Sequence, residues 1–335
     1  MNILATLKST YSLVVKPNLK IGFLCGFLIL ITGCVQMPKT AEHDPSVQSI
    51  EFNGFKFHYE TAGDPNNPVV IVLHGGPGAD YRYLLPMANL ADEYFVVFYD
   101  QLGTGLSQRV ESEEITVNSF IRDLNSFVDH FGRGKPVRLI GHSWGAMLAS
   151  AFTGQYPNKV EALVMAEPGF VEYQQLKTLM DQQGGPSAKM IWGLSTAWFN
   201  KWRAHGDAFA KNDFFMNKAI LLFQSPEELC EGQLPNMQFW RFGSSNFDAT
   251  IGRTMKDDEF AKTLNFARGI ENYAGDVLML TGACNQLTGF QYQEQFLPYY
   301  PGTELISIPD AGHFMLTENP EAAKAQIDRF FKRGL

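Results

Sequence analysis

A serine in a glycine-flanked turn constrains this chain more than any other feature. Ser143 lies in the run Gly141-His142-Ser143-Trp144-Gly145, directly after the apolar segment 137–140 and before a small-residue-rich segment of helical character. In that context a G-x-S-x-G run forms a sharp turn between a strand and a helix, and the turn exposes the serine at the edge of a sheet. The sequence therefore predicts Ser143 as a nucleophile.

Strand-like and helix-like segments alternate around this turn. A hairpin is expected at 47–61 around Asn53-Gly54, and helices at 117–131, 146–156 and 320–331. Continuous apolar runs, typical of buried parallel strands, lie at 69–73, 95–99, 137–140, 162–166, 277–280 and 305–308. The alternation predicts an α/β fold in which helices flank a mostly parallel central sheet.

The pattern changes between residues 168 and 274, where no buried strand is evident. Four of the five tryptophans lie in this stretch, namely Trp192, Trp198, Trp202 and Trp240. We interpret residues 168–274 as a helical cap inserted into a core made of 47–167 and 275–335. Ligands of open α/β sheets bind outside the carboxyl ends of the strands, so a cap in this position would cover the site.

A serine hydroxyl is a weak nucleophile and needs a base, an orienting acid and two donors for the oxyanion. His313 follows the last expected strand and is the candidate base. The candidate oxyanion donors are the backbone amides of Trp144, which follows the serine, and Gly76, which lies in a glycine loop after a buried strand.

Three motifs occur in a fixed order: HGGPG at 74–78, DQLGTGLS at 100–107 and GHSWG at 141–145. In this order they resemble the α/β-hydrolase fold and, within it, the prolyl iminopeptidase-like family. The resemblance covers roughly residues 50–331. It implies cleavage of an N-terminal residue, often proline, with cap acids that hold the free amine. The same core is also found in esterases and amidases.

The chain departs from this family at two positions. Leu102 replaces the arginine of the second motif, which implies a missing ion pair. Asn285 stands where the family has the aspartate of the catalytic triad, and a neutral amide cannot stabilise a protonated histidine. Glu167 ends an earlier strand and keeps the order serine, acid, histidine along the chain. We therefore predict Glu167, rather than Asn285, as the partner of His313.

Residues of the cap provide candidates for substrate binding. Glu172, Glu231 and Trp240 are the ones we select. Glu228 belongs instead to a helix-capping sequence, Ser225-Pro226-Glu227-Glu228, so we interpret it as structural. The sequence has no metal-ligand spacing and no phosphate-binding loop, and we expect neither a metal nor another cofactor.

The first residues have the pattern of a bacterial lipoprotein signal. Three lysines precede an apolar run at 21–31, which is shorter than the ~20 residues of a membrane span, and Ile31-Thr32-Gly33-Cys34 resembles a lipobox. We predict a signal peptide at 1–33, a lipid on Cys34 and a polar tether at 34–46, rather than an uncleaved anchor. The residue after the cysteine is Val35, which favours the outer membrane of the bacterial cell envelope.

Two further cysteines, Cys230 and Cys284, remain in the mature chain. An exported protein could pair them, but the sequence does not place them in contact, and we favour two separate buried thiols. The formal charge of −8 and the lack of a basic cluster argue against nucleic acid as a partner.

Together these features predict a serine hydrolase that acts on a small molecule or short peptide. Our first hypothesis is an aminopeptidase acting on peptides with a free N-terminus. The alternatives are a carboxylesterase acting on small esters and a non-catalytic binding module of the cell envelope. Asn285 is the best support for the binding module, whereas the intact Ser143, His313 and glycine loops oppose it.

Overall fold

The computed structural model describes residues 33–182, 187–233 and 237–333. Its main sheet has eight strands in the order β10-β9-β7-β6-β4-β5-β3-β2, and only β3 runs antiparallel to the rest. The strands are β2 (Ser49–Phe52), β3 (Phe55–Ala62), β4 (Val69–Leu73), β5 (Phe95–Tyr99), β6 (Val137–His142), β7 (Val160–Ala166), β9 (Asp276–Gly282) and β10 (Glu304–Ile308). The predicted fold class and the predicted hairpin are confirmed.

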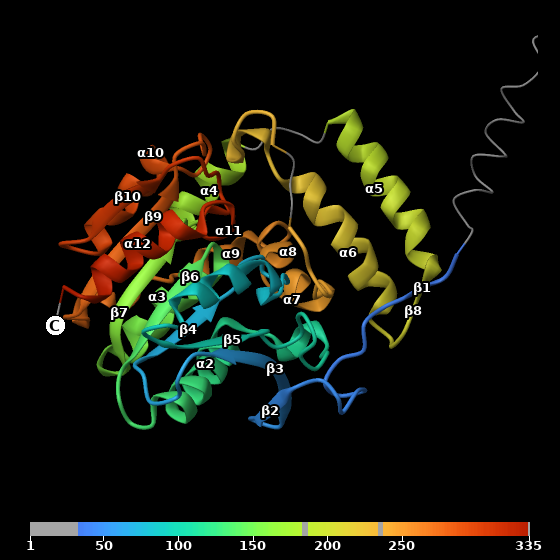
Figure 1. The fold of residues 1–335 in the computed structure, drawn as a ribbon. Coiled ribbons are helices and arrows are strands. Elements are labelled where there is room, and N and C mark those ends of the chain that lie inside the picture. Colours follow the sequence, from blue (N-terminus) through green and yellow to red (C-terminus); the bar gives the residue numbers. More distant parts are fainter. Residues whose placement is uncertain (1–32, 183–186, 234–236, 334–335) are drawn as a thin grey trace, which may run out of the picture.

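Helices cover both faces of this sheet (Figure 1). One face packs on α2 (Val117–Gly132), α3 (Trp144–Gln155) and η7 (Glu294–Tyr299), which follows α10 (Phe290–Gln293). The other face packs on η1 (Tyr81–Leu90), α11 (Met315–Glu318) and α12 (Pro320–Phe331). Short turns of 3-10 helix occur at η2 (Ser112–Glu114), η3 (Pro157–Lys159) and η6 (Ile270–Asn272). The central strands are buried from both sides, which explains their unbroken apolar runs.

Short helices occupy most of the region between β7 and β9. They are α4 (Tyr173–Gln182), α5 (Ala188–Asn200), η4 (Lys201–Arg203), α6 (Ala210–Phe223), η5 (Pro226–Glu228), α7 (Ser244–Ala249), α8 (Ile251–Thr254) and α9 (Asp258–Thr263). Figure 1 shows α5 and α6 lying side by side, away from the central sheet. In the described part of the chain no helix is long and apolar enough to cross a membrane.

The segment that we expected to be a polar tether packs against the folded protein. Residues Val35–Gln36 form strand β1, which pairs with β8 (Ala204–His205) between η4 and α6. Met37, Thr40 and Ala41 are buried, and the Ala41 amide donates to the Leu106 carbonyl. Apolar side chains among the polar ones allow this packing, so the prediction of a free tether is wrong for 35–41.

Candidate active site

Ser143 lies on a strained turn at the carboxyl end of β6. Its backbone has φ 53° and ψ −117°, and helix α3 starts at the next residue. A side chain on Gly141 would overlap the Gly145 carbonyl, and one on Gly145 would overlap the Leu73 carbonyl. These two glycines therefore allow the turn to fit against strand β4, and the turn holds the serine above the sheet edge.

His313 and Glu167 meet at the same sheet edge, from two strands that are separate in the sequence. His313 follows β10, and Glu167 follows β7 directly. His313 Nδ1 lies 2.6 Å from Glu167 Oε2, and the carboxylate is fully buried. Glu167 itself has a left-handed backbone with φ 44°, and its amide donates to the Leu280 carbonyl.

Three other donors fix the Glu167 carboxylate. The Thr281 hydroxyl and the Gly282 amide donate to Oε1 at 2.6 and 2.8 Å. Asn285 Nδ2 donates to Oε2 at 2.6 Å. The asparagine at the family's acid position thus acts as a hydrogen-bond donor to the glutamate. These bonds satisfy the buried carboxylate and fix its orientation.

The contact with Glu167 sets the state of the His313 ring. Because a carboxylate accepts, Nδ1 carries the hydrogen and Nε2 keeps its lone pair. Burial by itself would lower the pKa of His313, but the hydrogen bond and negative charge of Glu167 hold this pKa above 6.5. A general base requires the tautomer described above, with the hydrogen on Nδ1 and the lone pair on Nε2.

A second histidine, His142, lies beside the first, with ring centroids 4.8 Å apart. Burial lowers the pKa of His142 to about 3, so the ring is neutral. Its Nε2 donates to the His313 carbonyl at 2.8 Å, and its Nδ1 accepts from the Tyr83 hydroxyl at 2.8 Å. Tyr83 in turn accepts from the Gly75 amide. His142 therefore links the histidine loop to the glycine loop and has no free nitrogen to act as a base.

The two candidate oxyanion donors face the same cavity as Ser143 and His313. Within the described residues, the backbone amides of Gly76 and Trp144 donate no hydrogen bond, so both can donate to an oxyanion. No hydrogen bond joins Ser143 Oγ to His313 Nε2 within that part of the chain. Such contacts are often long in unliganded enzymes and shorten when substrate binds.

The cavity has a volume of about 600 Å³ and extends from Ser143 into the cap. Most of its lining is apolar, from α4, α5, α6 and α8 as well as from the core. Residues that define its far wall are Leu176, Leu179, Met190, Leu194, Ile220 and Phe223.

Comparison with known proteins places this arrangement in a family. Residues 68–320 match the family described as alpha/beta hydrolase fold. The chain belongs to the alpha/beta hydrolase fold family. It is 30% identical over 288 residues to a cis-3-alkyl-4-alkyloxetan-2-one decarboxylase of Shewanella oneidensis, an alignment that covers 83% of this chain and 86% of that one.

Other relatives of this hydrolase match over shorter lengths. A proline iminopeptidase of Lactobacillus acidophilus is 33% identical over 122 residues, which are 34% of this chain and 41% of that one. The chain spans about two fifths of the length of this relative and of mammalian epoxide hydrolase 4. A solved proline iminopeptidase of Mycobacterium smegmatis superposes with a TM-score of 0.57 at 18% identity, covering 85% of this chain and 97% of that one.

The three cap residues predicted to bind substrate do not line the cavity. Glu172 bonds Asn265 and the Tyr299 hydroxyl, away from Ser143. Glu231 is exposed, and the Trp240 ring packs on Tyr81 while its amide donates to Asp80. None of the three lines the cavity, so this prediction is not supported. The lack of buried strands pointed to a cap, but it does not tell which side chains of the cap turn inward.

Sequence reasoning missed two polar side chains that do line the cavity of the hydrolase. Glu228 forms the predicted capping box with Ser225, and it also faces the cavity, where burial raises the pKa of its carboxyl group. The side-chain amide of Gln224 has no partner in the described structure although its polar atoms are buried. A capping signal predicts only the local bond, and nothing in the sequence shows where the carboxylate points.

Cys230 and Cys284 form a disulfide, so the prediction of two separate thiols is wrong. Their Cα atoms lie 4.9 Å apart although 54 residues separate them in the chain. The bridge joins the segment after η5 to the loop after β9. Close to this bridge, the His313 amide donates to the Glu228 carbonyl at 2.8 Å. A bridge of this kind typically adds about 2–4 kcal/mol, and here it fixes the cap beside the histidine loop.

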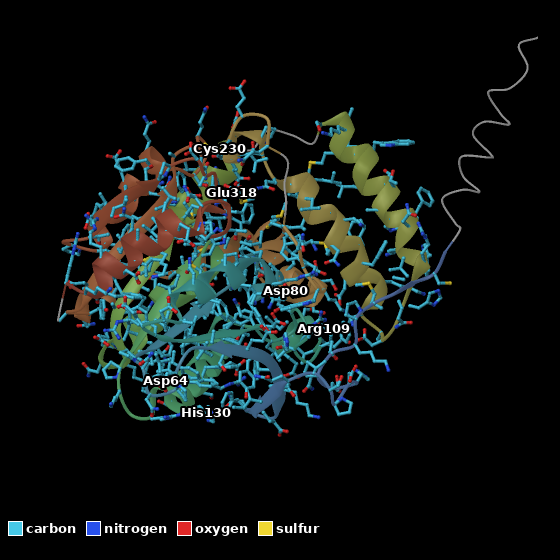
Figure 2. The ribbon with its side chains drawn as sticks, in the orientation of Figure 1. Asp64, Asp80, Arg109, His130, Cys230 and Glu318 are labelled. Carbon is cyan, nitrogen blue, oxygen red and sulfur yellow. A yellow bond between two sulfur atoms is a disulfide. The ribbon has the colours of Figure 1, made fainter. Side chains whose placement is uncertain are left out.

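Leu102, where the family has arginine, is buried in the apolar core of the hydrolase. An ion-pair network that includes Arg109, which Figure 2 labels, joins the core to the cap. Asp213 of α6 accepts from Arg109 at 3.0 Å and from Arg241 at 2.7 Å, and all three side chains are buried. Arg241 also donates to the Pro38 carbonyl. The network therefore joins the core loop, the cap and the N-terminal segment.

Proposed function

We propose that this protein is a serine hydrolase that cleaves a carboxylic ester through an acyl-enzyme on Ser143. The observation that carries the proposal is the buried Glu167 carboxylate bonded to His313 Nδ1, at a cavity that also holds Ser143. This contact leaves Nε2 able to accept a proton. It also removes the main support for a non-catalytic binding module, which was the missing acid at residue 285.

The reaction follows from these positions. Ser143 Oγ attacks the ester carbonyl carbon while His313 Nε2 takes the hydroxyl proton. The Gly76 and Trp144 amides hold the negative oxygen of the tetrahedral intermediate. His313 then gives the proton to the leaving alcohol, and the acyl-enzyme forms. Water, activated in the same way by His313, attacks the acyl carbon and releases the carboxylic acid.

The cavity favours an ester with an apolar acyl group. Its far wall is aliphatic and aromatic, and its volume of about 600 Å³ accommodates a medium acyl chain. An aminopeptidase needs carboxylates that hold a free amine, but Glu172 and Glu231 lie outside the cavity. We therefore place the esterase ahead of the prolyl iminopeptidase-like reaction.

One observation favours the aminopeptidase as a second candidate. The Glu228 carboxyl group lines the cavity close enough to His313 for their charges to interact, and it is the only acidic side chain among the described lining residues. An ammonium group seated beside Glu228 would favour the charged form of this carboxyl group. The partial identity to proline iminopeptidase agrees with this candidate.

A substrate panel distinguishes the two candidates. We expect kcat/KM for p-nitrophenyl esters to rise from acetate to octanoate and to exceed that for proline p-nitroanilide. Leu194→Trp fills the far wall, so it should lower the octanoate rate about tenfold or more relative to acetate. A preference for the proline substrate that Glu228→Gln abolishes would contradict the esterase and establish the aminopeptidase.

We also propose that the protein is lipid-anchored at Cys34 in the bacterial cell envelope, with the outer membrane favoured. The lipobox-like run supports the anchor, and Cys34 is exposed. The Cys230–Cys284 bridge agrees with an oxidising compartment, because disulfides persist there. Mass spectrometry of the peptide that begins at Cys34 tests the proposal, and an unmodified Cys34 in the envelope fraction would contradict it.

A further inference from the structure

Helix α5 is apolar on two opposite faces. One face packs against the protein: Ala197 is buried, Leu194 lines the cavity, and a Cβ on Gly193 would lie 2.6 Å from Leu222 of α6. The other face carries five large apolar side chains that remain exposed, namely Ile191 (54%), Trp192 (70%), Trp198 (48%), Phe199 (53%) and Trp202 (58%) of α5 and η4. We call these five residues the tryptophan patch.

Such a surface is unusual for a helix at the edge of a protein. An ordinary surface helix turns polar residues outward, and a large exposed apolar patch marks an interaction surface. The patch residues recur at helical spacing, because 198 and 199 lie seven residues after 191 and 192, and 202 lies four residues after 198, so they form one stripe. A stripe of this length is not required by the fold, because the opposite face already packs on α6.

Lysines border the tryptophan patch. Lys201 Nζ lies 5.5 Å from the Trp198 ring centroid and 5.7 Å from that of Trp202, and Lys211 Nζ lies 4.5 Å from the latter. The sequence has no acidic residue from 182 to 206, in a chain whose formal charge is −8. Tryptophan together with lysine is the composition of helices that lie in the headgroup region of anionic bilayers.

The chain reaches the tryptophan patch from its predicted site of membrane attachment. Val35, the residue after Cys34, pairs with Ala204, which directly follows η4. Figure 1 shows β1 running beside the end of α5. Cys34 therefore lies next to η4. A lipid on Cys34 and an uncleaved apolar run at 21–31 would both bring the membrane to this end of the helix.

We propose that the tryptophan patch docks into the headgroup region of an anionic lipid bilayer, with α5 lying along the surface. In this orientation the other face of α5 lines the catalytic cavity, so an ester taken from the bilayer has a short path to Ser143. The docking surface rests on the proposed membrane attachment and does not depend on the reaction catalysed.

Quenching of tryptophan fluorescence tests this docking. The full chain is mixed with vesicles of phosphatidylcholine and phosphatidylglycerol, with or without bromine on the acyl chains. Because three of the five tryptophans belong to the patch, we expect brominated vesicles to remove a large share of the emission. In the triple variant W192F/W198F/W202F the remaining emission comes from Trp144, which is buried, and from Trp240, whose ring packs on Tyr81, and bromine should leave it unchanged.

A charge-reversal variant checks the role of the lysines. K201E/K211E keeps every fluorophore, and each reversal removes roughly a fivefold gain in affinity for an anionic surface. We expect its quenching on anionic vesicles to fall to the level on pure phosphatidylcholine. Circular dichroism and thermal unfolding verify that both variants are folded.

Two results would overturn the proposal. The first is a parent protein that co-sediments with both kinds of vesicle but has the same tryptophan emission with brominated and with plain lipid. The patch would then face water although the protein is bound. The second is unchanged quenching in the triple phenylalanine variant. If the parent is a dimer that the charge reversal dissociates, and no quenching occurs, the patch binds a second copy of the chain instead.

Discussion

Replacing Glu167 by glutamine is expected to lower kcat about 10³–10⁴-fold. The glutamine amide can keep a similar shape, but it carries no charge to stabilise protonated His313, and it can favour the wrong tautomer of the ring. Glu167 Oε2 accepts directly from His313 Nδ1, so the full effect of the charge is lost. Steady-state kinetics on a short p-nitrophenyl ester measures this change.

Asn285 provides the matched control for this substitution. In Asn285→Ala the carboxylate loses one of its four donors and keeps those from Thr281, Gly282 and His313. We expect kcat to fall about tenfold or less, in line with one lost charge-assisted hydrogen bond. The double variant Glu167→Gln/Asn285→Asp returns a carboxylate to the family position and should recover part of the rate. A larger loss in Asn285→Ala than in Glu167→Gln would contradict our assignment.

The second large effect is expected at the serine. Ser143→Ala should lower kcat about 10⁶-fold, as removal of the nucleophile does in other serine hydrolases. A fluorophosphonate probe should label the parent protein on the Ser143 peptide and leave the alanine variant unlabelled. Ser195→Ala serves as the control, because this exposed hydroxyl only bonds the Ile191 carbonyl within α5. Labelling that persists in Ser143→Ala would place the nucleophile elsewhere.

The core of the fold and the residues around Ser143 follow from local sequence signals. Apolar runs mark the buried strands, and the strand bounds at 69–73 and 95–99 agree with β4 and β5. Glu167 could be selected because parallel strands end at one edge of the sheet, so a carboxylate after β7 comes close to the histidine after β10.

Contacts between distant segments could not be obtained in the same way. The pairing of Cys230 with Cys284 depends on where the cap returns to the core, and no periodicity encodes this. The packing of residues 35–41 depends on strand β8, the Leu106 carbonyl and Arg241, all of which are distant in the sequence. Glu228 lies in a three-residue 3-10 turn and Trp240 lies outside any helix, so no periodicity predicts where their side chains point.

The pH dependence of kcat/KM tests the partnership of Glu167 with His313 most directly. His313 must be neutral to accept the serine proton, so activity rises with pH through its pKa. Glu167 holds this pKa above 6.5, and its neutral replacement should move the acid limb of the profile to lower pH in Glu167→Gln. A shift in that direction, together with an unshifted limb in Asn285→Ala, is the predicted result. Coincident acid limbs in the parent and Glu167→Gln would show that another group partners His313.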